Sequence, residues 1–132
     1  MVREDRLTHV VQAITDDSRP NVHVAPEMHP GVEGEHYSFS LHVLERLSDP
    51  DAEATALHEL AHIYLDHDDD PALAAIPRGT TARGPWELAA DALAAAFVEH
   101  AADLGVMTDP SASLDYLFRD AADYAERVTL PP

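Results

Sequence analysis

The sequence predicts an α+β fold, in which a short antiparallel sheet packs against helices. Two short segments, 21–25 and 37–43, alternate apolar and polar side chains as half-buried strands do. Four longer segments are predicted to be helices from their apolar spacing or their capping residues, and the helical and strand patterns do not alternate regularly along the chain. At 132 residues with 45% hydrophobic content, the chain is long enough for one core, so we expect residues 1–132 to form a single domain.

The first half of the chain contains one helix and both strands. An amphipathic helix is expected over 3–15, and the acids and proline at 16–20 end it. Strand 21–25 follows, then a loop rich in proline and glycine over 26–34, then strand 37–43. The strand over 37–43 places four apolar residues on one face: Tyr37, Phe39, Leu41 and Val43.

The second half is predicted to be mainly helical. Ser48 and the residues after it supply a capping oxygen, a proline and acids at a helix start, so a helix should run to Leu65. Residues 66–84 are predicted to be largely irregular, with a short helical turn near 72–76. A second long helix is expected from Pro85 to about Leu104, and a C-terminal helix should start near Asp109 and cover the core.

The charge balance excludes several classes of function. Eight basic residues stand against 25 acidic ones, and the formal charge of -17 repels nucleic acid and anionic lipid. The N-terminus contains acids where a signal peptide would be basic, and no apolar run is long enough to span a bilayer. The chain has no cysteine, which is compatible with a reducing compartment. We therefore expect a cytoplasmic protein with no direct nucleic-acid or membrane partner.

The most informative stretch is an HExxH run, formed by His58, Glu59 and His62. Residues four apart lie on the same face of a helix, so both imidazoles can bind one ion with Glu59 beside it. The alternative is a pair of histidines and an acid that form ion pairs on a helix surface.

Two acids on the following long helix favour the metal site. Glu87 and Asp91 lie four residues apart in an otherwise apolar segment, and acids are rarely buried unless they are paired or bind a metal. Two histidines and a glutamate are a ligand set that catalytic Zn²⁺ uses, so His58, His62 and Glu87 are the predicted ligands. Asp91 would then accept a hydrogen bond from a metal-binding histidine, and Glu59 would be the general base.

Other histidines carry weaker hypotheses. His67 lies five residues after His62, so a surface position or a place behind the ligands is expected for it. His36 is interpreted as an ordinary loop or strand-face histidine, like three others: His23, His29 and His42. Of these, His42 has the best functional claim, because its strand could be the one alongside which an extended peptide adds.

These motifs resemble those of the gluzincins, whose pattern is HExxH followed by ExxxD on a later helix. Within that class the chain is most similar to the ImmA/IrrE family of small zinc metallopeptidases, over about residues 21–100. The resemblance implies a zincin-like fold, in which the sheet packs on the HExxH helix and on a second ligand-bearing helix. It also implies that His58, His62 and Glu87 bind Zn²⁺, that Glu59 is the catalytic base and that Asp91 orients a ligand. Ala61 departs from the family pattern, which usually has glycine there.

The functional prediction is a zinc-dependent endopeptidase of narrow specificity that acts on a protein or peptide. Members that this chain resembles cleave a helix-turn-helix repressor, and that substrate is implied by the resemblance alone. The alternative is a non-catalytic interaction module, such as a regulator or an antitoxin-like partner, in which zinc only holds two helices together.

Overall fold

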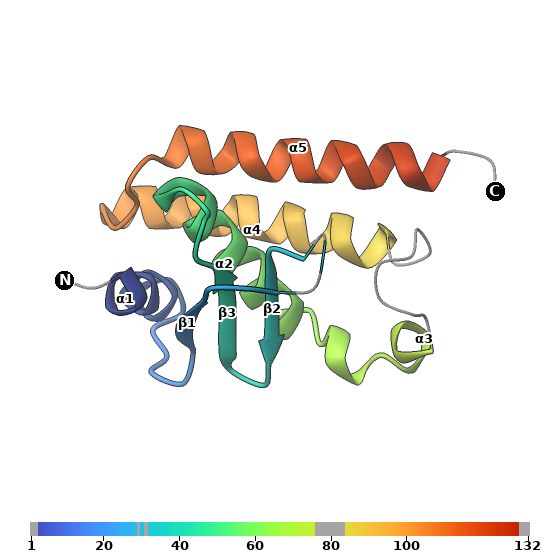
Figure 1. The fold of residues 1–132 in the computed structure, drawn as a ribbon, viewed down its shortest axis with the longest axis horizontal. Coiled ribbons are helices and arrows are strands. Elements are labelled where there is room, and N and C mark those ends of the chain that lie inside the picture. Colours follow the sequence, from blue (N-terminus) through green and yellow to red (C-terminus); the bar gives the residue numbers. More distant parts are fainter. Residues whose placement is uncertain (1–2, 29, 31, 76–83, 130–132) are drawn as a thin grey trace.

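The computed structural model describes residues 3–28, 30, 32–75 and 84–129, which form a three-stranded sheet covered by helices (Figure 1). The predicted α+β class is therefore confirmed. In chain order the elements are α1 (Arg3–Thr15), β1 (Asn21–Ala25), β2 (Gly34–Tyr37), β3 (Ser40–Leu44), α2 (Asp49–Tyr64), the 3-10 turn η1 (His67–Asp69), α3 (Pro71–Ala74), α4 (Gly84–Leu104) and α5 (Pro110–Thr129).

The sheet is mixed, so the prediction of an antiparallel sheet is wrong for one of its two strand pairs. The strand order is β1-β3-β2; β3 pairs in parallel with β1 and antiparallel with β2. The chain leaves β1, forms β2 at the edge of the sheet and turns back into β3 between the two. Because β3 reverses the direction of β2, it runs in the same direction as β1.

The segment 37–43 is a hairpin rather than one strand. Tyr37 ends β2 and pairs with Ser40, which begins β3, and a two-residue turn joins them. The turn requires the left-handed conformation at Ser38, whose φ is 54°. Alternation continues through a two-residue turn without losing phase, and no Asn-Gly or Asp-Gly signal marks this one. The apolar–polar alternation over 37–43 therefore does not show that the chain reverses direction there.

Helix α2 lies at the centre of the molecule, because every residue from Ala52 to His62 is buried. It contacts β2 and β3 on one side and α4 and α5 on the other. The predicted capping is present: Ser48 accepts a hydrogen bond from the Asp51 backbone N–H at 3.3 Å, and Pro50 lies in the first turn. A helix buried on all sides has few polar positions, so the polar residues that α2 does bury need partners.

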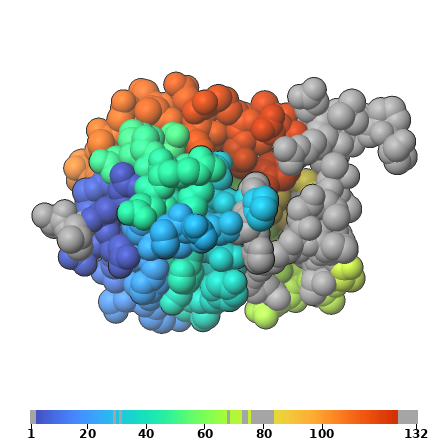
Figure 2. All heavy atoms as spheres, viewed as in Figure 1, coloured from blue at the N-terminus to red at the C-terminus, as the bar shows by residue number. Residues whose placement is uncertain are grey.

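The other long helices also agree with the prediction. Helix α4 ends before Gly105, whose φ of 73° is the left-handed conformation expected after a helix. Asp109 caps α5 by accepting a hydrogen bond from the Ala112 N–H. Helices α4 and α5 pack side by side (Figure 1), and α5 forms a ridge along one edge of the molecule (Figure 2). The short helical turn expected near 72–76 is present as α3, while residues 76–83 lie outside the described residues.

Strand β2 approaches α2 so closely that only glycine fits at its first position. A Cβ on Gly34 would lie 2.4 Å from Thr55 Cγ2 and 3.3 Å from Glu59 Cγ. Thr55 is buried and β-branched, so its side chain has little freedom to rotate away. This close contact fixes the distance between the edge strand and the helix that carries the HExxH run.

We expect Gly34→Ala to destabilise the protein by about 1–3 kcal/mol, because the added methyl group overpacks this contact. Urea unfolding measures the effect. Thr55→Ser removes the methyl carbon that the new Cβ meets, so the double variant should recover much of the loss. A double variant whose losses simply add would show that the contact with Thr55 is not the cause.

Candidate metal centre

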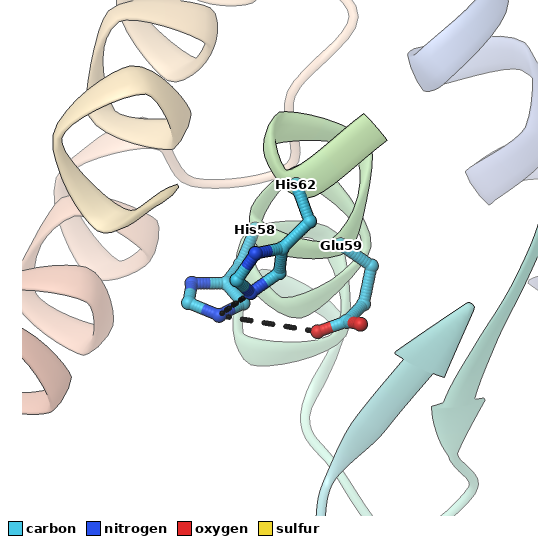
Figure 3. Close-up of side chains that lie close together, drawn as sticks. All are labelled: His58, Glu59 and His62. Atoms are coloured by element: carbon cyan, nitrogen blue, oxygen red, sulfur yellow. Dashed lines mark hydrogen bonds and ion pairs between the residues drawn. The ribbon is translucent and has the colours of Figure 1, made fainter. Parts of the chain in front are cut away.

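Helix α2 places His58, Glu59 and His62 together at its C-terminal half (Figure 3). The three residues are only 6–8% exposed, and the two histidine Nε2 atoms lie 3.1 Å apart. The four-residue spacing puts both rings on one face of the helix, as the sequence predicted. This arrangement differs from the alternative of an ion-paired cluster on a helix surface, because the cluster is buried.

Helix α4 adds a carboxylate to the same point. Glu87 Oε2 lies 2.7 Å from His58 Nε2 and 3.2 Å from His62 Nε2. Glu87 stands in the first turn of α4, which packs against α2. Three side-chain atoms from two helices, Nε2, Nε2 and Oε2, thus face one another.

The donor set fits a zinc ion in chemical type and in spacing. Tetrahedral zinc binds histidine nitrogen and carboxylate oxygen at about 2.0–2.2 Å, which separates neighbouring ligand atoms by roughly 3.3 Å. The three atoms here lie 2.7–3.2 Å apart. An ion would therefore require them to spread by about 0.1–0.6 Å, which small side-chain rotations provide.

Glu59 also lies within reach of the cluster. His58, Glu59 and His62 each offer a ligand atom within 4.8 Å of the others, so these three residues by themselves could hold an ion. However, Glu59 Oε2 is 3.9 Å from His58 Nε2, whereas Glu87 Oε2 is 2.7 Å from the same nitrogen. The geometry therefore favours Glu87 as the carboxylate that completes the set and leaves Glu59 beside it.

Each histidine has a partner at its other ring nitrogen. His58 Nδ1 lies 2.7 Å from Asp91 Oδ1, and Asp91 is only 2% exposed. His62 Nδ1 lies 2.7 Å from His67 Nδ1. These contacts fix the ring orientations and keep a hydrogen on the Nδ1 of each ring when its Nε2 binds a cation.

His67 reaches this position because the chain reverses after α2. Asp66 adopts the left-handed conformation with φ of 56°, and η1 brings His67 back against the last turn of the helix. His67 is buried, so the expected place behind the ligands is the one observed, and the surface position is not.

The charges in the cluster stabilise one another. Burial alone would lower the pKa of His58, but hydrogen bonds to Asp91 and Glu87 outweigh it and hold this pKa well above its usual range. Burial would raise the pKa of Glu87, but hydrogen bonds from the two imidazoles hold it well below its usual range. The pocket therefore favours positive charge among the three ligand atoms, which a cation satisfies.

Two further residues lie at the site that sequence patterns did not single out for it. His36, on β2, has its Nδ1 2.9 Å from Glu59 Oε1. Asp120, on α5, forms a second group of potential ligand atoms with His58 and Asp91, all within 4.8 Å of one another. Neither residue belongs to a motif, and only the fold brings β2 and α5 to the centre.

Asp120 lies close to Asp91, and one oxygen of Asp91 lacks a hydrogen bond. Among the described residues, Asp91 Oδ2 is buried without a partner. Burial, together with the neighbouring Asp91 carboxylate, raises the pKa of Asp120 to about 8. A protonated Asp120 carboxyl group can donate to Asp91 and so extend the chain of contacts that ends at His58.

The raised pKa of Asp120 predicts a pH-dependent stability in chelator-treated protein. Its contribution should be complete below pH 4 and should be lost as the pH rises through about 8. Asp120→Asn removes this titration, so its free energy of unfolding should rise relative to wild type between pH 4 and pH 8. Urea unfolding across this range, with Asp115→Asn on the exposed side of α5 as the control, measures the difference. If the free energies of unfolding of wild type and Asp120→Asn change with pH in parallel, the raised pKa of Asp120 is contradicted.

The described helices include none that is both long enough and apolar enough to cross a lipid bilayer.

Comparison with known proteins agrees with the motifs. Residues 17–104 match the family model described as the IrrE N-terminal-like domain, of the peptidase M78 family. Searches among curated proteins and among solved structures gave no significant match. The matched region contains both strand pairs, α2 and α4, and therefore His58, Glu59, His62, Glu87 and Asp91. The chain belongs to the IrrE N-terminal-like family of metallopeptidases.

Proposed function

We propose that the protein is a zinc-dependent endopeptidase in which His58, His62 and Glu87 hold the ion. The observation that carries the proposal is the convergence of His58 Nε2, His62 Nε2 and Glu87 Oε2 within 3.2 Å of one another, in a buried site. Membership of a metallopeptidase family supports the reaction class. When bound, zinc polarises a substrate carbonyl and lowers the pKa of a water molecule.

Glu59 is the proposed general base. One of its oxygens, Oε1, contacts His36, and the other lies 3.9 Å from His58 Nε2, beside the ligand atoms but not among the nearest. Burial alone would raise the pKa of Glu59, but His36 and the other nearby imidazoles lower it, so the carboxylate is ionised and ready to accept a proton. Glu59 would take the proton of the attacking water and return it to the leaving amine nitrogen.

Asp91 and His67 are proposed to orient the ligands. Asp91 accepts a hydrogen bond from His58 Nδ1, which raises the basicity of the opposite nitrogen. His67 accepts one from His62 Nδ1 in the tautomer that leaves His62 Nε2 unprotonated. The two ligand imidazoles are thereby held from behind by side chains of different elements.

The edge strand β2 is the proposed place for an extended substrate. Strand β2 lies at the end of the sheet and carries His36, which contacts Glu59, so a peptide paired with this edge would pass the base. The earlier interpretation of His42 is wrong in this respect, because His42 lies on the central strand β3 and is paired on both sides.

The substrate is proposed to be a regulatory protein, such as a helix-turn-helix repressor, cleaved in the cytoplasm at few sites. This part of the proposal rests on the family resemblance. The net charge of -17 is compatible with it, since a strongly acidic surface attracts basic proteins.

Metal analysis tests the ligands. Purified wild-type protein should contain about one zinc per chain, and His62→Ala should lose it, because two ligands hold zinc poorly. His100→Ala, on the exposed side of α4, is the matched control and should keep the metal. A folded wild-type protein that binds no zinc would overturn the proposal.

Glu59→Gln tests the reaction. The variant should keep its zinc but cleave a library of proteome-derived peptides about 10²–10⁴-fold more slowly, because the amide cannot accept the proton. Mass spectrometry of the cleaved peptides measures this, with Glu45→Gln on the surface as the control. A zinc-loaded wild type that cleaves no peptide would favour the alternative, a non-catalytic interaction module.

A further inference from the structure

His36 connects the edge strand to the proposed base. Its Nδ1 lies 2.9 Å from Glu59 Oε1, and its side chain is only 8% exposed. Its ring also stacks on that of His62, with centroids 5.7 Å apart and an angle of 20° between the planes. One buried side chain from β2 therefore touches both the proposed base and a proposed ligand.

The direction of this hydrogen bond follows from the acceptor. An ionised carboxylate has no proton to give, so His36 Nδ1 carries the hydrogen and donates to Glu59 Oε1. The bond is buried, where an unmade hydrogen bond to a charged group is costly. The hydrogen bond from His36 therefore holds Glu59 Oε1 toward β2.

Glu59 could also bind the metal ion directly, and it would then no longer act as the general base. One of its carboxylate oxygens is already within 4.8 Å of a nitrogen of each imidazole, and Oε2 lies 3.9 Å from His58 Nε2, so Glu59 could join the ligand set. A carboxylate that binds the ion is no longer available to take a proton. Something must therefore keep Glu59 beside the ligand set, and the close packing of Gly34 against Thr55 and Glu59 brings His36 into place to do so.

We propose that His36 is a positioning residue, which anchors Glu59 Oε1 through its Nδ1–H and so keeps Glu59 out of the metal ligand set. This inference rests on the proposed function. Glu59 Oε2 then remains turned toward the reacting atoms, while Glu87 supplies the carboxylate ligand.

The test uses Co²⁺ as the probe, because its visible absorption weakens as the coordination number increases. Five full-length proteins are compared after loading with Co²⁺: wild type, His36→Ala, His36→Asn, His36→Ala with Glu59→Gln, and His23→Ala. The amide nitrogen of asparagine occupies the position of Nδ1 and keeps the donor. His23 is exposed on β1 and serves as the matched control. Circular dichroism establishes that each variant is folded.

We expect His36→Ala to weaken and shift the Co²⁺ bands, because Glu59 joins the ligands, and to lower peptide cleavage about 10–100-fold. His36→Asn and His23→Ala should retain the wild-type spectrum, and Glu59→Gln should restore it in the His36→Ala background. A wild-type spectrum in His36→Ala, in protein that binds one Co²⁺ per chain, would overturn this inference and leave the proposed function standing. Failure of the wild type to bind Co²⁺ would overturn both.

Discussion

The contact between α2 and α4 is the constraint on which the rest of the site depends. It buries His58 against Glu87 and Asp91, which place a carboxylate at each of its two ring nitrogens. Charged groups are costly in a core unless they are paired, so neither helix could bury its polar residues without the other. The residues that make α2 and α4 chemically unusual are therefore also the ones that specify how the two helices meet.

The same logic extends to the elements around α2. Each polar residue that the helix buries near its C-terminal end receives a partner from a different part of the fold: Glu59 from β2, His58 from α4 and His62 from η1. Small residues make this possible. Gly34 lets β2 approach the helix, and Ala61, which lies between His58 and His62 on α2, is fully buried. A core built in this way holds its side chains in one arrangement, because moving any element removes a partner from a buried charge.

Sequence patterns predicted the local part of this structure and missed the non-local part. Helical periodicity and capping residues gave the four long helices, and the four-residue spacings gave both pairs that meet at the site, His58 with His62 and Glu87 with Asp91. The parallel pairing of β1 with β3 and the hairpin at Ser38 were missed, because alternation carries no information on strand direction. His36 is interpreted from the sequence as an ordinary histidine for a related reason. Its role depends on where the edge of the sheet packs against α2, and the spacing of residues along the chain does not predict that contact.

The arrangement also decides how a cation and protons compete at the centre. The raised pKa of His58 keeps a proton on the imidazole, and a metal ion that binds its Nε2 must displace that proton. Asp91 remains hydrogen-bonded to Nδ1 in either case, so the exchange occurs at Nε2 alone. Beside it, Glu87, Glu59 and Asp91 bring three carboxylates to two imidazoles, an excess of negative charge that one dication offsets in large part. Metal uptake should therefore release protons and strengthen as the pH rises, because the same carboxylates that hold the proton on His58 also attract the ion that replaces it.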